Sequence, residues 1–139
     1  MVLLIGFEAT AAPASSPSAL PAWSTTQAQA NRYVSAHGLR AFAGGYSEDG
    51  LEFWTFPLQL VSGYALDFVR PGAPSLPGIT VLTSVEVDPF GVTRLYTGPD
   101  FQVRERIATR AKHRGVLVRY SVQGRATWNF GSTSVRPST

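Results

Sequence analysis

Residues 101–123 read FQVRERIATRAKHRGVLVRYSVQ, and this stretch decides the fold class. Two segments of alternating apolar and polar residues flank the polar turn at residues 112–115. Period-two alternation indicates β-strands, and a short polar turn between two such strands predicts an antiparallel hairpin. We expect Val118 and Tyr120 to face the core from one side of the second strand and Arg119 to face away from it.

Similar segments precede this hairpin along the chain. Turn signals separate them, for example Asp49-Gly50 and Asp88-Pro89. Tyr46 and Phe53, on either side of the Asp49-Gly50 turn, are candidate cross-strand neighbours. The one candidate helix, residues 25–35, lacks a convincing apolar stripe. The fold class we predict is therefore all-β, an antiparallel β-sandwich of two sheets, with further strands at residues 39–43, 51–56, 64–69, 79–87, 92–97 and near 128–130.

Composition agrees with a single small β domain. The 139 residues suffice for one core, and 10 prolines with 13 glycines leave little room for long helices. The absence of cysteine excludes disulfides, thiolate metal sites and a cysteine nucleophile. The net charge of +3 is concentrated in residues 91–139, where nine basic residues face two acidic ones. Such a basic half raises the question of a nucleic acid or another anionic surface as partner.

The first 22 residues have a different character. An apolar run at residues 2–7 is followed by two A-x-A patterns, at residues 9–11 and 12–14, which resemble the end of a secretory signal and its cleavage site. We therefore expect a periplasmic or secreted protein, with a tail at residues 1–22, the β domain at 23–130 and a disordered end at 131–139. No segment is apolar over a length that would span a membrane.

The stretch from Asn31 to Gly124 resembles the N-terminal β-sandwich of bacterial six-hairpin glycosidases, the group that includes amylo-α-1,6-glucosidase (glycogen-debranching) proteins. Three segments carry the resemblance: residues 45–60, 92–106 and 115–124. In that family the catalytic carboxylates lie on an α/α barrel that follows the sandwich. The resemblance implies that this chain is the non-catalytic front part of a glycan-active hydrolase. No catalytic residue is carried over.

Candidate site residues are few. Most carboxylates of the sequence lie in turns, where turn formation explains them, so we assign no catalytic residue. Glu52 is the exception, because it stands beside Phe53 and Trp54 in a strand, where a carboxylate and aromatic rings can meet sugar hydroxyls and sugar faces. Rings in an alternating strand are more often core than binding surface. Glu52, Phe53 and Trp54 are the candidate carbohydrate-binding residues, and we predict no metal site and no cofactor.

Two alternatives stay open for the partner. A carbohydrate or a following α/α-barrel domain is the first. A stand-alone module for carbohydrate or single-stranded nucleic acid is the second, although no recognition motif for nucleic acid is present. In the nucleic-acid alternative, bases would stack on Phe101 and Tyr120. The backbone phosphates would contact the basic residues Arg104, Arg106, Arg110, Lys112, Arg114 and Arg119. We otherwise expect residues 104–106 to form part of a solvated outer face, paired with neighbouring side chains.

Overall fold

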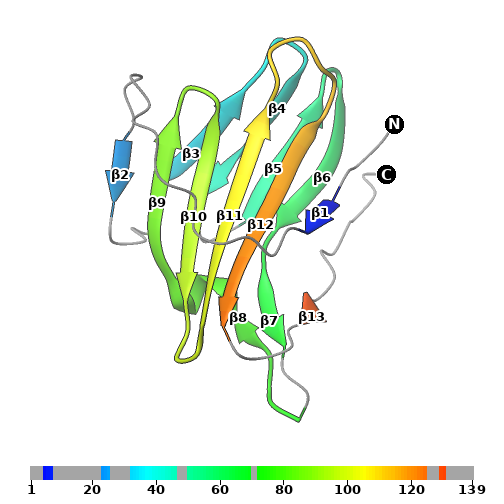
Figure 1. Ribbon diagram of the computed structural model, residues 1–139. Coiled ribbons are helices and arrows are strands. Elements are labelled where there is room, and N and C mark those ends of the chain that lie inside the picture. The colour runs from blue at the N-terminus through cyan, green and yellow to red at the C-terminus, as the bar shows by residue number, and fades with distance from the viewer. Residues whose placement is uncertain are drawn as a thin grey trace.

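The computed structural model describes residues 5–7, 23–25, 32–46, 50–69, 72–124 and 129–130. These residues form β-strands joined by turns, with one short 3-10 helix, η1 (Gly78–Val81), among them (Figure 1). The all-β class predicted from the sequence is confirmed. Within these ranges, no helix has the length and apolar character needed to cross a membrane.

The larger sheet has six strands in the order β1-β12-β11-β10-β9-β2. Its centre is a run of consecutive antiparallel hairpins, as the alternating sequence predicts. The edge strand β1 adds in parallel to β12, so cleavage after either A-x-A pattern would remove β1 and leave β12 at the edge. The strands are β1 (Ile5–Phe7), β2 (Trp23–Thr25), β9 (Leu82–Asp88), β10 (Gly91–Thr97), β11 (Phe101–Thr109) and β12 (Val116–Gly124).

The second sheet has four strands in sequence order, each antiparallel to the next: β3 (Tyr33–His37), β4 (Ala41–Tyr46), β5 (Gly50–Thr55) and β6 (Leu58–Tyr64). One expectation is wrong here: Tyr46 lies opposite Gly50 while Phe53 lies opposite Ala43. Residues 47–49, between Tyr46 and Gly50, lie outside the described part. Strand β3 begins within residues 25–35, the segment that lacked an apolar stripe for a helix.

A third, small sheet joins β13 (Asn129–Phe130), β7 (Asp67–Val69) and β8 (Leu76–Pro77). The strand expected near residues 128–130 therefore exists at Asn129–Phe130, antiparallel to β7. The strand expected over residues 79–87 begins later, at Leu82, because η1 occupies the residues before it.

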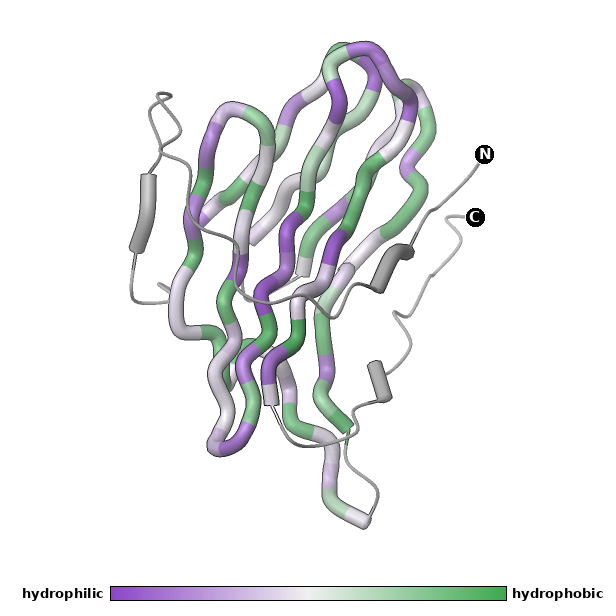
Figure 2. The backbone as a smooth tube through the Cα atoms, viewed as in Figure 1, coloured by the Kyte–Doolittle hydropathy of each residue, from purple (hydrophilic) through white to green (hydrophobic). Residues whose placement is uncertain are grey.

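The core lies between the two larger sheets. In Figure 1 the four-stranded sheet lies behind the long strands β9–β12, and buried side chains from both sheets form one hydrophobic cluster. The hydropathy of the long strands changes from residue to residue along the tube, as Figure 2 shows. Val103 and Ile107 of β11 have no exposed surface. Val118 and Tyr120 are 5% and 8% exposed, so the predicted inward face of β12 is confirmed.

The inward face of β12 gives a first prediction. Val118→Asp should place an unpaired carboxylate in the core and lower the free energy of unfolding by more than about 3 kcal/mol. Arg119→Asp changes an exposed neighbour and should alter stability by about 0.5 kcal/mol or less. Chemical denaturation of both variants measures the difference. Equal losses would contradict the register of β12.

Candidate functional site

A charged side chain lies inside the core. Glu105 in β11 has no exposed surface, and the side chain of Arg94 from β10 is 3% exposed. We expected residues 104–106 to pair on a solvated outer face, and for Glu105 this is wrong. Alternation along β11 turns Glu105 to the same side as Val103 and Ile107, and the burial of a carboxylate is made possible by the groups that meet it there.

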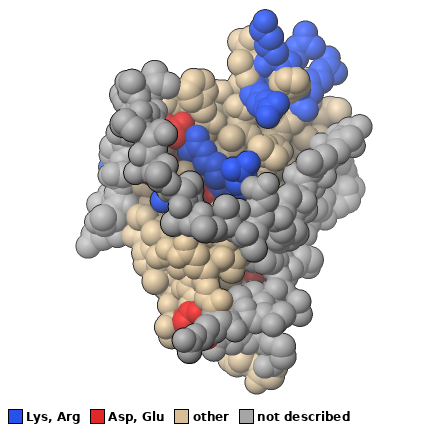
Figure 3. All heavy atoms as spheres, in the orientation of Figure 1, with Lys and Arg blue, Asp and Glu red and all other residues tan. Residues whose placement is uncertain are grey.

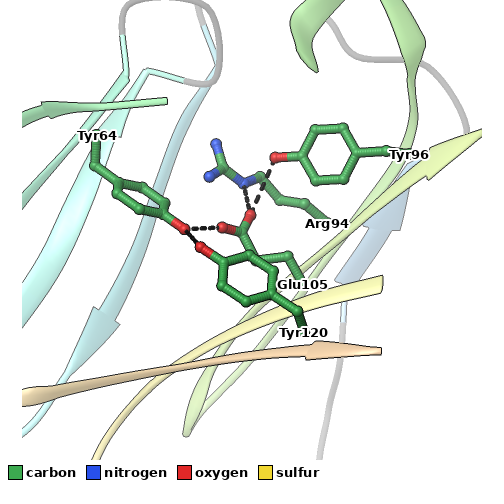
Figure 4. A network of polar contacts seen from close by, with 5 residues as sticks. All are labelled: Tyr64, Arg94, Tyr96, Glu105 and Tyr120. Carbon is green, nitrogen blue, oxygen red and sulfur yellow. Dashed lines mark hydrogen bonds and ion pairs between the residues drawn. The ribbon is translucent and has the colours of Figure 1, made fainter. Parts of the chain in front are cut away.

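Four side chains surround this carboxylate (Figure 4). Arg94 Nε donates to Glu105 Oε2 at 2.5 Å, and Tyr96 Oη donates to the same oxygen at 3.0 Å. Tyr64 from β6 donates to Oε1, and its hydroxyl also contacts that of Tyr120 from β12. The buried network (Tyr64, Arg94, Tyr96, Glu105 and Tyr120) thus joins one strand of the four-stranded sheet to three of the six-stranded sheet.

Burial and the Glu105 charge act on the ionisable groups of the network. Loss of water raises the pKa of Tyr64 and of Tyr96 well above the ordinary value, and the neighbouring Glu105 carboxylate adds to the rise. The same two causes raise the pKa of Tyr120 to about 12. These hydroxyls therefore stay protonated and act as donors. A carboxylate that accepts from three donors in a closed core has no access to a substrate, so this network is structural.

A cavity of about 210 Å³ lies beside the network. Its lining is mostly apolar and includes Leu66, Ile79 and Leu82, together with Tyr96 and Arg94. The Nη2 atom of Arg94 is buried and has no hydrogen-bond partner. That atom has almost no accessible surface, so a molecule in the cavity does not reach it without rearrangement.

The outer side of the four-stranded sheet presents a different chemistry. The register aligns outward residues in rows across β3, β4 and β5: His37 with Phe42 and Trp54, and Tyr33 with Tyr46. We call this surface the outer aromatic face, and it consists of Tyr33, Ser35, His37, Phe42, Gly44, Tyr46, Glu52 and Trp54.

Contacts within the outer aromatic face hold its rings in place. Tyr33 and Tyr46 pack edge to face with centroids 5.5 Å apart, and they are 53% and 44% exposed. The His37 and Phe42 rings lie 5.0 Å apart. The Phe42 ring lies over Gly44, where a Cβ would overlap it, so Gly44 is buried. The glycine therefore lets the Phe42 ring lie close against the central strand β4.

A carboxylate completes this face. Trp54 Nε1 donates to Glu52 Oε2 at 2.9 Å, and Glu52 is exposed. Partial burial raises the pKa of the Tyr33 hydroxyl, with the negative charge of Glu52 as the next cause. The face therefore combines flat apolar rings with one ionised acceptor and several neutral polar groups.

The sequence-based candidates separate into two groups. Trp54 and Glu52 lie together on the outer aromatic face, but Phe53 points the opposite way, is 3% exposed, and packs on Tyr64 with centroids 4.8 Å apart. Tyr33, Phe42 and Tyr46 also belong to this face and are not among the candidates from the sequence. The one signal for Tyr33 is the alternation of polar and apolar residues over 33–37, and residues 41–46 give no such signal for Phe42 and Tyr46.

The basic residues do not assemble the stacking surface considered for nucleic acid. Phe101 and Tyr120 are 4% and 8% exposed, so their rings are not available to bases. Arg106 does share an outer face with Arg104 and lies opposite Arg119, but its guanidinium donates to both oxygens of Asp88, at 2.6 and 2.9 Å. That ion pair holds the pKa of Asp88 below its usual value.

Metal binding has little support in the described ranges. His37 lies at the end of β3 and His113 lies in the β11–β12 turn, and both side chains are exposed. The described residues hold no group of three or more His, Asp or Glu side chains that would suit a metal ion.

The buried network gives a second prediction. Glu105→Gln should leave the Arg94 guanidinium buried without its counter-charge and lower the free energy of unfolding by about 3–5 kcal/mol. Glu52→Gln, the matched change at an exposed strand position, should cost less than about 1 kcal/mol. Urea denaturation of the two variants tests this. A Glu105→Gln variant as stable as Glu52→Gln would mean that the Glu105 carboxylate is not needed inside the core.

Ionisation of the buried tyrosines gives a third prediction. In the unfolded chain these hydroxyls lose their protons near the ordinary pKa of 10.0, whereas the folded chain keeps them, with the pKa of Tyr120 at about 12. The unfolded state therefore binds fewer protons above pH 10, and stability should fall as pH rises from 10 towards 12. Tyrosinate absorbance from Tyr64, Tyr96 and Tyr120 should appear only with the loss of circular dichroism. Ionisation of all five tyrosines while the fold persists would contradict this.

Comparison with known proteins identifies no relative of this chain. No protein-family model matches the chain, and no match is found among curated proteins or solved structures. The assignment of a function therefore depends on the chemistry of the described residues and on the sequence resemblance.

Proposed function

We propose that this chain is a non-catalytic β domain that contacts carbohydrate through the outer aromatic face. The observation that carries the proposal is the alignment of the exposed Tyr33–Tyr46 pair and the half-buried Phe42 and Trp54 rings on one sheet face, with Glu52 hydrogen-bonded to Trp54 among them. The proposal includes the setting implied by the sequence resemblance, in which such a domain supports the catalytic α/α barrel of a glycan-active hydrolase.

The chemistry of sugars fits this surface. A pyranose ring has an apolar face of C–H groups that packs on an aromatic ring, and an edge of hydroxyls that needs donors and acceptors. Trp54 and the Tyr33–Tyr46 pair offer rings, while Glu52, Ser35 and His37 offer polar atoms beside them. Hydrogen bonds to an ionised carboxylate are stronger than neutral ones, so Glu52 would orient a bound sugar.

Glu52, Asp88 and Glu105 do not form the pair of carboxyl groups that hydrolysis requires. Glycoside hydrolysis needs two carboxyl groups on either side of one bond, about 5–10 Å apart. Glu52 lies on the outer face of one sheet, and Glu105 lies in the core behind it, so the two cannot flank one sugar. Asp88 is engaged by Arg106. We therefore propose a binding role for the domain, with catalysis supplied by another domain.

Export forms part of the same proposal. The apolar run at residues 2–7 and the A-x-A patterns that follow support a periplasmic or secreted location, where polysaccharides are accessible. The single-stranded nucleic acid alternative has less support, because the rings that would stack on bases are buried.

A titration with α-glucan oligosaccharides gives a fourth prediction. The purified chain should bind them with an affinity that changes little with salt, and Trp54→Ala should weaken binding about tenfold or more, because truncation removes the ring that stands beside the Glu52 carboxylate. Isothermal titration calorimetry measures both. Phe90→Ala is the matched control: Phe90 is 59% exposed, lies in the β9–β10 turn and does not belong to the outer aromatic face.

Three outcomes would count against the proposal. Equal weakening by Trp54→Ala and Phe90→Ala would remove the outer aromatic face as the site. Binding of single-stranded DNA that falls steeply with salt and depends on Arg104 would favour the nucleic-acid alternative. Turnover of any glycan by this chain alone would contradict its non-catalytic role.

A further inference from the structure

Three turns meet at one end of the molecule, next to the row of His37, Phe42 and Trp54 in the outer aromatic face. The β3–β4 turn contacts the β11–β12 turn through a hydrogen bond from Leu39 N to Ala111 O, at 3.1 Å. The β5–β6 turn joins them through a hydrogen bond from Phe56 N to Arg40 O, also at 3.1 Å. These backbone bonds fix the three turns as one surface. We call it the tip, and it consists of Leu39, Arg40, Phe56, Leu58, Arg110, Lys112, His113 and Arg114.

Apolar side chains project from the tip into solvent. Leu39 is 78% exposed, Leu58 is 65% exposed and Phe56 is 56% exposed. Single exposed apolar residues are common on protein surfaces. Here three lie together, Leu39 and Phe56 in adjoining turns and Leu58 at the start of β6, so they form an exposed apolar patch. Their exposure carries a cost in water that a partner with an apolar interior would remove.

Cationic side chains surround these apolar ones. Arg40, Arg110, Lys112 and Arg114 are all exposed, and none forms an ion pair with a described residue. Figure 3 shows Lys and Arg side chains gathered at this end of the molecule. Asp88, at the end of β9, is already held by Arg106, so its charge is paired away from the tip cations.

We propose that the tip binds an anionic lipid surface. Leu39, Phe56 and Leu58 enter the boundary between headgroups and acyl chains, and the four cations contact lipid phosphates around them. A surface with apolar residues at its centre and Lys and Arg beside them is what interfacial binding requires, since burial and attraction to anionic headgroups add. A nucleic acid would use the cations but would leave the two leucines without a partner.

The orientation that follows keeps the carbohydrate surface open. Strands β3–β6, β11 and β12 are joined by the turns of the tip, so with the tip on a membrane these strands point away from it (Figure 1). The outer aromatic face then stands at the side of the molecule, with its Tyr33–Tyr46 row farthest from the membrane. The lipid proposal does not depend on the carbohydrate proposal, because the two use different residues.

Vesicle co-sedimentation of the full chain tests this proposal. Vesicles of phosphatidylcholine with phosphatidylglycerol should sediment the protein, and vesicles of phosphatidylcholine alone should not. Lys112→Gln with Arg114→Gln should lower the partition coefficient roughly 25-fold, about fivefold for each charge. Leu39→Ser with Leu58→Ser should lower it about tenfold or more, because these side chains lose their apolar contact. Arg104→Gln, an exposed arginine in mid-strand, is the matched control and should leave binding unchanged.

The possible outcomes separate lipid from other partners. Thermal melting of each variant checks that it is folded, and all the substituted positions are exposed. Binding that depends on the charges and not on the leucines, and that single-stranded DNA displaces, would identify a general polyanion site and overturn the proposal. Absence of binding to phosphatidylglycerol vesicles, or equal losses in the tip variants and Arg104→Gln, would also overturn it.

Discussion

The hydrogen bond between Tyr64 and Glu105 is the constraint on which the rest of the molecule depends. It joins β6 of the four-stranded sheet to β11 of the six-stranded sheet inside the core. A buried carboxylate is costly unless its partners are all in place. A shift of β11 by one residue would turn Glu105 outward and leave Arg94 and the tyrosine hydroxyls without it. The network therefore penalises wrong registers more strongly than apolar contacts alone would.

This inner constraint also determines what the outer surface presents. Because side chains alternate along a strand, fixing Phe53 and Leu51 inward fixes Glu52 and Trp54 outward. The pairing of β4 with β3 and β5 then brings side chains from three strands into the same rows. The ring positions of the outer aromatic face are thus a consequence of the core, and the glycine at position 44 lets the Phe42 ring lie against the central strand.

The sequence predicts those features whose residues are close together along the chain, and it does not predict contacts between distant segments. The hairpins of residues 91–124 were predicted because alternation and turn residues are local. Strand β3 was missed because Ser35 and Ala36 give weak contrast between its faces, and the pairing of β13 with β7 joins residues far apart in sequence. Glu52 and Trp54 are two residues apart, so their neighbourhood was predictable, whereas Tyr33 and Tyr46 meet only through the register of a strand that was not predicted. The alternation along β11 is consistent with an inward Glu105, but a charged side chain without a known partner is expected to face solvent. Its partner Arg94 lies on another strand, so the sequence does not show that the charge is paired.

The distribution of charge connects the interior with the proposed surfaces. Arg94 and Glu105 neutralise each other in the core, and Arg106 and Asp88 do so at the edge of the core. Each pair has no net charge, so it adds little to the electrostatic potential a few ångströms outside the molecule. The positive excess of the chain is therefore carried by residues outside these two pairs. Among the described residues, Arg40, Arg110, Lys112 and Arg114 lie together at the tip, while Arg104 and Arg119 are exposed on the six-stranded sheet. The outer aromatic face, whose only described acid is Glu52, lies on the other sheet and stays suited to an uncharged ligand.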